Sequence, residues 1–427
     1  MTQDAAAAIT AVWRHESTRL VAALARMTRD LGLAEDLAQD ALVAALEQWP
    51  RSGVPARPGA WLMQVAKRRA VDHYRRAETL RRRTDELTRE TEEADVPDLV
   101  DSVDHIEDDV LRLMFLTCHP VLTPESRAAL TLRLVGGLTT QEIARAFLVK
   151  ETTMGQRISR AKRTLADAEV SFELPVGADR EARMADVLAV VYLIFNEGYA
   201  ATTGPDWIRP ELCLEALRLA RVLTRLVPDD PEVLGLQALL ELQASRTTAR
   251  LDAEGRPVLL EAQDRARWDH LLIRRGLRAL QQALALGTPV GTYVLQAEIA
   301  ACHARARRPE DTDWGRIASL YDLLARLSPG PVVEVNRAVA HGRASGPDDG
   351  LAILDAVGPE PFGGSHLFPA VRGDLLERAG RRSEAAAAFR DAAARTANRG
   401  EQTVLLRRAE EMCATDVEDD PARPTNE

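Results

Sequence analysis

The chain has 427 residues and a formal net charge of -10, and 46% of its residues are hydrophobic but only 4% aromatic. This length exceeds a single ordinary core, so two to four domains are expected. The acidic balance argues against indiscriminate nucleic-acid binding, although the charges are segregated along the chain. Four well-separated cysteines without a CxxC pair argue against a disulfide framework or a zinc ribbon.

Hydrophobic segments are too short to span a bilayer. No run of about 18 uninterrupted apolar residues occurs, and the N-terminus lacks a signal-peptide pattern. We therefore expect a soluble cytoplasmic protein with no membrane partner. The chain is rich in Ala, Leu, Arg and Glu and shows little of the alternation that marks strands, which predicts an all-α fold.

Two helices are predicted first, over residues 5–25 and 34–49. In the second helix, AEDLAQDALVAALEQW, the residues expected to be buried are Leu37, Ala41, Ala44 and Ala45. An acidic, polar edge is formed by Glu35, Asp36, Gln39 and Asp40. Favourable charge in the first turn of a helix also explains Glu35 and Asp36. We expect Pro50 to end this helix and residues 51–58 to form a loop.

A basic helix is predicted over residues 59–76, GAWLMQVAKRRAVDHYRR. It begins apolar and aromatic and becomes densely basic, with Trp61, Val65 and Arg68 expected on one face. Such a helix can hold phosphates with its cations and stack an indole on an unpaired base. An ordinary amphipathic helix with a core tryptophan and solvated arginines is the alternative.

This acidic helix, loop and tryptophan-bearing basic helix resemble the second domain of bacterial RNA polymerase sigma factors, particularly the extracytoplasmic-function type. The matching stretches are residues 34–42 and 60–76. In that family the first stretch docks on the clamp helices of the largest polymerase subunit, and the second melts and reads the -10 element. The resemblance implies polymerase contacts at Glu35, Asp36, Gln39 and Asp40. It implies -10 contacts at Trp61, Lys67, Arg68, Asp72, Arg75 and Arg76, although many members carry Asn in place of Arg68.

Charge reverses in the next stretch. Twelve carboxylates and one arginine, Arg89, lie within residues 85–109. Like charges at this density favour a solvated, extended linker. A functional alternative is an acidic strand that mimics nucleic acid, either in the RNA exit channel of the polymerase or over the basic helix of the free protein. The channel path also follows from the resemblance.

A helix-turn-helix is predicted over residues 138–147 and 150–165, after short helices at 109–118 and 123–134. Thr139 or Thr140 is the expected N-cap. Apolar residues three or four positions apart predict a buried stripe of Met154, Ile158, Ala161 and Leu165. The outer face then fits a major groove, with DNA contacts expected from Thr152, Thr153, Gln156, Arg157, Arg160, Lys162 and Arg163. A plain surface helix is the alternative.

This segment resembles the fourth domain of sigma factors, which binds the -35 element. Gly155 lies inside the recognition helix, where a glycine costs about 1 kcal/mol relative to alanine. The helix is therefore expected to settle fully only on DNA.

The rest of the chain reads as helix after helix. A spacing of about 35 residues between helix pairs is near the tetratricopeptide (TPR) repeat, so we predict a TPR-like helical domain. Its concave surface would bind a peptide or protein, unless the extension only stabilises its neighbour. The predicted division is a sigma-two-like domain at 1–78, an acidic linker at 79–108, a sigma-four-like domain at 109–171 and the TPR-like domain at 179–415.

The whole arrangement resembles a subgroup of extracytoplasmic-function sigma factors with a large TPR-like extension. Residues 112–149, 190–201 and 311–324 carry this resemblance. It implies a factor that directs core RNA polymerase to specific promoters and helps open the -10 region, with the extension modulating activity.

Core RNA polymerase, promoter DNA and a protein or peptide ligand are the expected partners. We expect no catalytic residues, metal site or cofactor, since no metal spacing, phosphate loop or nucleophile motif appears. A one-component helix-turn-helix regulator with a TPR-like sensor is the alternative.

Overall fold

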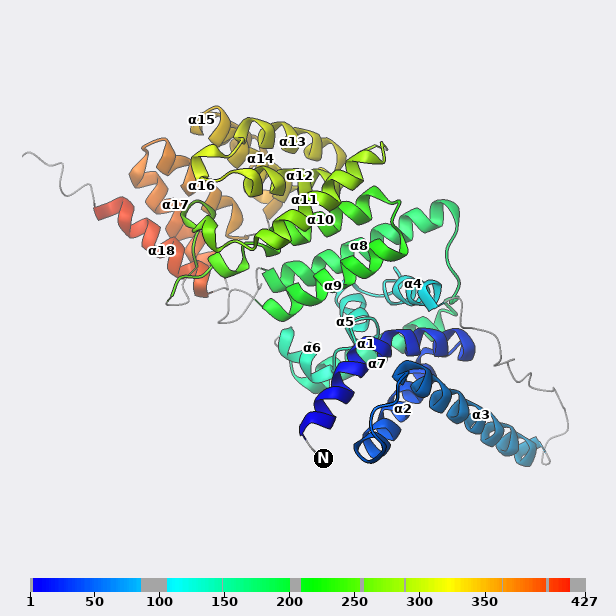
Figure 1. Ribbon diagram of the computed structural model, residues 1–427. Coiled ribbons are helices and arrows are strands. Elements are labelled where there is room, and N and C mark those ends of the chain that lie inside the picture. Colours follow the sequence, from blue (N-terminus) through cyan, green and yellow to red (C-terminus); the bar gives the residue numbers. More distant parts are fainter. Residues whose placement is uncertain are drawn as a thin grey trace, which may run out of the picture. The chain divides into compact units, whose positions relative to one another are not determined.

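The computed structural model describes residues 3–85, 106–147, 149–199, 209–253, 257–287, 289–362, 364–396 and 399–414. Over these ranges the chain is helical and contains no β-strand, which confirms the all-α prediction (Figure 1). The chain divides into two compact units, Met1–Leu193 and Ile194–Glu427. No helix in the described ranges is long and apolar enough to cross a membrane.

Three helices begin the first unit: α1 (Gln3–Thr28), α2 (Leu31–Ser52) and α3 (Pro58–Asp85). They pack on one another. The Asp30 side chain caps α2 by accepting from the Leu33 N–H at 3.0 Å. The predicted stripe of α2 is confirmed as buried: Leu37, Ala41, Ala44 and Ala45.

The prediction that Pro50 ends α2 is wrong, because the helix continues to Ser52. Proline removes one backbone donor and disfavours helix before it. Here the preceding residue, Trp49, is anchored with only 3% of its surface exposed. The Gly53 N–H also bonds to the Trp49 carbonyl at 2.9 Å, which holds the last turn together.

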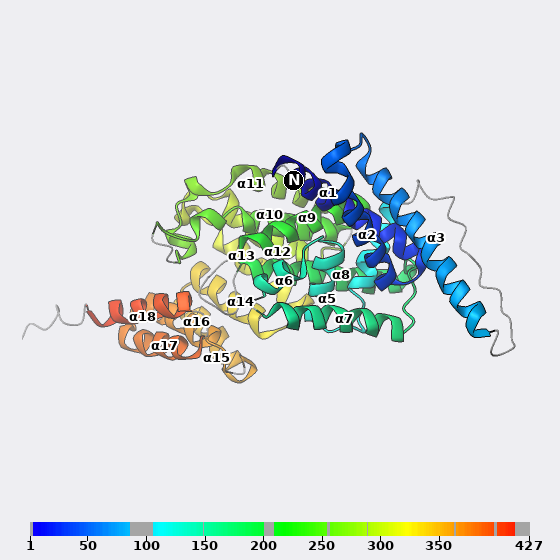
Figure 2. The same ribbon diagram turned by 90° about the horizontal axis from the view of Figure 1, so that it is seen from below.

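The helix α3 extends as one long helix beyond the predicted basic stretch (Figure 2). Its buried stripe consists of Leu62, Ala66 and Ala70. Trp61, Val65 and Arg68 lie along one side of this helix as predicted, with Trp61 and Val65 half-buried and Arg68 exposed. Small alanines at a spacing of four let α3 approach its neighbours closely, and this packing sets the inward face.

Four helices follow in the first unit: α4 (Ile106–Thr117), α5 (Pro124–Leu134), α6 (Thr140–Ala146) and α7 (Glu151–Asp167). The helix-turn-helix is confirmed. Thr139 caps α6 in a capping box with Glu142. The predicted stripe of α7 is buried as expected, at Met154, Ile158, Ala161 and Leu165.

Helix α8 (Gly177–Tyr199) begins in the first unit, and its residues from Ile194 belong to the second. Its first half is fixed by two polar contacts. Arg183 donates to the Phe115 carbonyl at 2.6 Å, and Asp186 pairs with Arg127 at 2.8 Å. The start of α8 is therefore anchored on α4 and α5.

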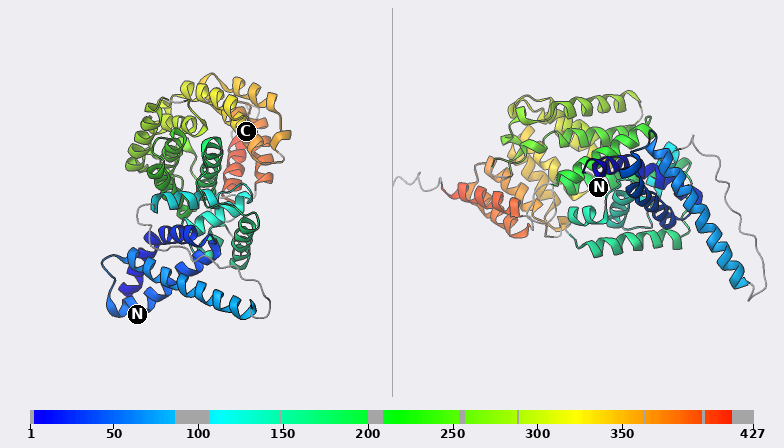
Figure 3. Two further views of the ribbon diagram at one scale, coloured as in Figure 1. Left: turned by 90° about the vertical axis from the view of Figure 1, so that its right-hand side faces the viewer. Right: turned by 60° about the horizontal axis from the view of Figure 1, so that its bottom comes forward.

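The second unit is a succession of helices in which neighbours along the chain pack together (Figure 3). The helices are α9 (Pro210–Leu226), α10 (Pro231–Ala244), α11 (His270–Ala285), α12 (Thr292–Arg305), α13 (Trp314–Leu327), α14 (Pro331–Ala344), α15 (Pro347–Val357), α16 (Leu367–Arg378), α17 (Arg382–Arg395) and α18 (Arg399–Ala414). Short 3-10 turns are η1 (Thr247–Ala249), η2 (Leu260–Ala262), η3 (Arg265–Arg267), η4 (Pro309–Asp311) and η5 (Glu360–Phe362).

Small residues let these helices approach closely. A Cβ at Gly235 of α10 would meet the Val294 backbone of α12 at 2.7 Å, so only glycine fits there. Gly350 and Leu354 of α15 are buried, as are Ala385 and Phe389 of α17. Gly350 and Ala385 are 35 positions apart, as are Leu354 and Phe389, so these buried positions recur at the predicted repeat spacing. Membership of the TPR class stays a prediction.

Candidate nucleic-acid and polymerase interface

Helix α3 presents the residues that were predicted to contact the -10 element. Arg68, Asp72, Arg75 and Arg76 are exposed, and Lys67 is half-buried. Trp61 is also half-buried, with its ring centroid 5.2 Å from that of Trp49 and the rings at 62°. Trp49 therefore holds the indole in place while part of it stays accessible, and cations follow along the helix. This arrangement can engage phosphates and an unpaired base.

Helix α7 presents the residues that were predicted to contact the -35 element. The exposed members are Thr152, Thr153, Gln156, Arg160 and Arg163, and the half-buried members are Arg157 and Lys162. A Cβ at Gly155 would have Thr140 Cγ2, at 3.8 Å, as its nearest neighbour, so an alanine fits there. Gly155 therefore lies on the side of α7 next to α6, and a methyl group there would make ordinary contact with Thr140.

The four residues of α2 that were predicted to contact polymerase are in different environments. Asp36 is exposed and Gln39 is half-buried. Asp40 is also half-buried, and its carboxylate pairs with exposed Arg69 of α3 at 3.2 Å. A pair this exposed adds at most about 1 kcal/mol to stability. Glu35 is only 6% exposed, so its predicted place on an exposed edge is wrong in this structure.

Glu35 is buried because two cations from the helix-turn-helix surround its carboxylate. Its Oε1 accepts from Arg133 Nε of α5 at 2.7 Å, and its Oε2 pairs with Lys162 Nζ of α7. Burial raises the pKa of Glu35, but Lys162 and Arg133 outweigh that effect and hold the pKa below its ordinary value. The carboxylate is therefore ionised at neutral pH and joins α2 to α5 and α7.

Family comparisons match two parts of this first unit. Residues 12–79 match Sigma-70 region 2, and residues 112–165 match Sigma-70, region 4. Residues 183–284 match a family of unknown function. The chain belongs to the extracytoplasmic-function sigma factors of the sigma-70 family. Its role is in transcription initiation, with core RNA polymerase and promoter DNA as partners.

Relatives of this sigma factor differ in how much of the chain they share. An uncharacterized protein of Rhizobium meliloti is 44% identical over 398 residues, which is 92% of this chain and 93% of the relative. The probable ECF RNA polymerase sigma factor SigI of Mycobacterium tuberculosis is 30% identical over 164 residues, 38% of this chain and 56% of SigI. The ECF RNA polymerase sigma factor SigK of Mycobacterium ulcerans is 29% identical over 155 residues, 35% of this chain and 80% of SigK.

A second set of contacts joins regions 2 and 4 of the sigma factor. Asp109 of α4 is 1% exposed and accepts from Arg26 of α1 at 3.0 Å and from Arg112 at 2.8 Å. The Thr18 hydroxyl donates to the Val135 carbonyl at 2.8 Å. Asp109 thus belongs to a buried contact and not to a solvated acidic run. Most of that run, residues 86–105, lies outside the described residues, together with the hypotheses about it.

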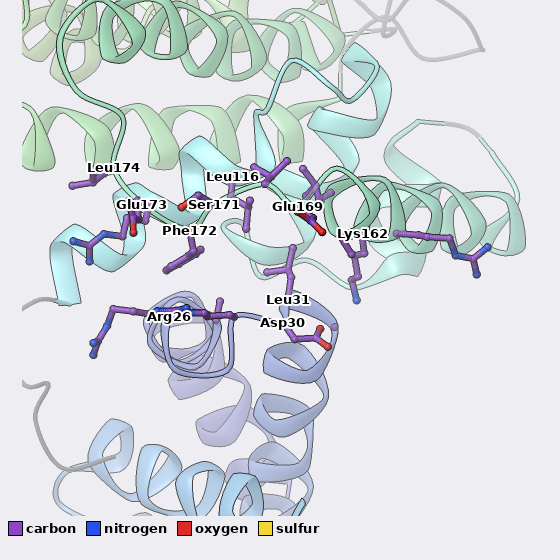
Figure 4. Close-up of a pocket in the computed structure, with 18 residues that line it drawn as sticks. Arg26, Asp30, Leu31, Leu116, Lys162, Glu169, Ser171, Phe172, Glu173 and Leu174 are labelled. Carbon is purple, nitrogen blue, oxygen red and sulfur yellow. The ribbon is translucent and has the colours of Figure 1, made fainter. Parts of the chain in front are cut away.

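An open cavity of about 1180 Å³ lies where α1, α2, α4 and α7 meet (Figure 4). Phe172, in the segment after α7, points toward α1, and Leu31 and Leu116 also line the cavity. Two lining residues, Arg29 and Glu169, have left-handed backbones with φ of 51° and 47°. Each ends a helix, a position that favours glycine. The junction of regions 2 and 4 therefore leaves an open space beside the Glu35 ion pairs.

Sequence reasoning did not find the junction residues Arg133, Arg26 and Asp109. Arg133 is 98 positions from Glu35, and Arg26 is 83 positions from Asp109. Nothing in the local pattern distinguishes these charges from solvated ones. Covariation between distant positions in related sequences is the signal that could have identified these pairs.

Proposed function

We propose that this sigma factor directs core RNA polymerase to promoters that carry a -10 and a -35 element and helps to open the -10 region. The presence of regions 2 and 4 in one chain carries the proposal. It is supported by the accessible basic side of α3 and the exposed polar face of α7. A lone helix-turn-helix would suggest only duplex binding.

The proposed -10 contacts are Trp61, Lys67, Arg68, Asp72, Arg75 and Arg76. The proposed -35 contacts are Thr152, Thr153, Gln156, Arg157, Arg160, Lys162 and Arg163. On α2 we propose that Asp36, Gln39 and Asp40 contact the polymerase directly. Glu35 would reach the polymerase only after its two ion pairs break.

The described arrangement is, in this proposal, a closed form of the factor. Lys162 neutralises Glu35 and is then a poor phosphate ligand. This ion pair therefore engages one residue of the proposed polymerase surface, Glu35, and one residue of the proposed -35 surface, Lys162. Hydrogen bonds to charged groups contribute about 1.5–3 kcal/mol each. Since about 1.4 kcal/mol changes an equilibrium tenfold, polymerase binding competes with a closed form favoured roughly 10- to 100-fold by this contact.

We further propose that the second unit modulates this activity. The family match of unknown function begins at residue 183, within the half of α8 that Arg183 and Asp186 fix on α4 and α5. A change at the second unit thus has a continuous helix through which to reach region 4. A protein or peptide ligand on the helical repeats is one proposed source of that change.

Run-off transcription with purified core polymerase tests the central proposal. Wild-type protein is expected to start RNA synthesis from its promoter. A variant with both Trp61→Ala and Arg157→Ala is expected to lose about 2–6 kcal/mol of promoter interaction, from one stacking and one base-reading contact. Arg278→Gln, at an exposed arginine of α11, is the matched control. Equal activity of the double variant would refute the residue roles.

A one-component regulator is the second candidate. It would bind its operator as a duplex without polymerase and would start no transcript with core enzyme. Duplex binding by the free protein together with an absence of run-off product would replace the first proposal with this one.

A further inference from the structure

The second unit contains arginines stacked on aromatic rings near the start of α11. The Cζ atom of Arg246 lies 5.8 Å from the ring centroid of Tyr199 and 6.0 Å from that of Trp268. Arg265 lies 4.8 Å from the Trp268 centroid. The Asp269 N–H bonds to the Ser245 carbonyl at 2.8 Å, which brings the end of α10 beside the start of α11.

These two arginines have neutral acceptors only. Arg246 donates to the Tyr199 hydroxyl at 2.7 Å and to the amide oxygen of Gln243. Arg265 donates to the carbonyls of His303 and Ala306 at 2.6 and 2.8 Å and so caps α12. Within the described ranges neither guanidinium forms an ion pair with a carboxylate. Asp311 and Glu310 act on Arg265 from a distance, but burial and the charge of Arg246 outweigh them and lower the pKa of Arg265. The desolvation cost of these cations is therefore only partly offset within the chain.

Buried nitrogen atoms at the same place lack a hydrogen-bond partner. They are Arg265 Nε, Trp268 Nε1 and His303 Nδ1. The indole of Trp268 is 4% exposed. An unpaired buried polar group destabilises the fold, and such groups are few in folded proteins. Because the cap on α12 uses Nη1 of Arg265, its Nε stays unused.

The pKa of His303 shows that the electrostatic potential at its imidazole is positive. Burial and then the charges of Arg246 and Arg265 lower its pKa to about 3. Its imidazole is therefore neutral at physiological pH. The ring lies 5.2 Å from that of Trp314, centroid to centroid, so a second tryptophan adjoins the cluster. Positive charge around His303 thus exceeds negative charge.

We propose that Arg246, Arg265, Trp268 and His303 form a binding site for an oxyanion, the carboxylate or phosphate group of a small ligand. Such a group accepts several N–H donors at once and supplies the missing negative charge. Guanidinium is well suited to both groups because its planar donors match their oxygens. The half-buried ring of Trp314 offers apolar surface to the remainder of the ligand. The site lies in the second unit and does not depend on the promoter contacts.

Tryptophan fluorescence of the full-length protein tests this site. Sodium phosphate and tricarballylate are titrated separately at constant ionic strength, one probe for each source of the oxyanion. At least one anion is expected to give a saturable change with a Kd of about 1 mM or tighter. Arg246→Gln is expected to weaken this binding tenfold or more, whereas Arg278→Gln, an exposed arginine on α11, leaves it unchanged.

Nuclear magnetic resonance of the His303 ring gives a readout that does not require the variant to fold. Anion binding to the wild-type protein is expected to raise the pKa of His303 from about 3. Saturation by phosphate alone or by tricarballylate alone assigns the source, and saturation by both supports a general oxyanion site. The proposal is overturned if neither anion produces saturation and His303 does not shift, or if Arg246→Gln folds and binds as tightly as wild type.

Discussion

Charge is treated in opposite ways at two sites, the junction of regions 2 and 4 in the first unit and the cluster of Arg246, Arg265, Trp268 and His303 in the second. In the first unit each buried carboxylate at the junction of regions 2 and 4 has two cations: Glu35 has Arg133 and Lys162, and Asp109 has Arg26 and Arg112. In the second unit Arg246 and Arg265 have only neutral acceptors. Paired charges fix one element against another, whereas unpaired charges destabilise the fold unless a partner arrives from outside the chain.

Removing a paired charge should have the largest effect on stability. Asp109→Asn leaves Arg26 and Arg112 without their carboxylate and is expected to lower the free energy of unfolding by about 2–3 kcal/mol, a moderate value because both arginines are partly exposed. Denaturant unfolding of the full chain measures the change. Asp167→Asn, at the exposed end of α7, is the control and should stay near wild type. If Asp109→Asn lost no more stability than the control, the Asp109 ion pairs would not be stabilising.

Acid should destabilise the second unit through His303. The folded-state pKa of about 3 lies below the ordinary 6.5, so the unfolded chain binds more protons between these values. Stability is therefore expected to fall as pH drops from 6.5 toward 3. His303→Gln should reduce this slope, measured by thermal unfolding across that range, while His270→Gln on the exposed start of α11 should not. An unchanged slope in His303→Gln would refute the assignment.

Removing an unpaired charge should have a smaller effect than the loss of Asp109. Arg246→Gln gives up a ring contact and a hydrogen bond but also removes an unpaired cation. The free energy of unfolding is expected to change by no more than about 1 kcal/mol in the absence of added anions. A loss as large as that of Asp109→Asn would show that Arg246 is structural, and the contrast between the two sites would fail.

Gly155→Ala offers the smallest expected change. Alanine is favoured over glycine inside a helix by about 1 kcal/mol, and the nearest atom to the added Cβ is at 3.8 Å. Stability of the first unit should rise, and affinity for a -35 duplex, measured by fluorescence anisotropy, should increase or stay constant. A clear loss of affinity would show that DNA needs the bare backbone at this position.

The hydrophobic periodicity of the sequence correctly predicted features that are determined within a single helix. The buried stripe of α7 follows from spacing within a few residues and was predicted correctly. For the cap of α6 the sequence offered Thr139 or Thr140, and the structure has Thr139. The prediction was wrong where packing against residues distant in the sequence determines the extent of a helix. Buried Trp49 keeps α2 helical past Pro50, where the sequence predicted its end.

The burial of Glu35 was also beyond local patterns. An acidic residue in the first turns of a helix is explained by the helix dipole, whether or not a distant lysine reaches it. Its two partners, Arg133 and Lys162, lie 98 and 127 positions later in the chain. The role of this residue must therefore be tested by experiment.

Equilibrium binding of core polymerase to fluorescently labelled full-length protein tests the closed form most directly. If the Glu35 ion pairs hold regions 2 and 4 together, Glu35→Gln should bind core polymerase about tenfold more tightly, since it removes the competing contact. Asp36→Asn, an exposed neighbour on the same helix, should bind more weakly. Weaker binding by Glu35→Gln as well would contradict the account and make Glu35 a direct polymerase contact.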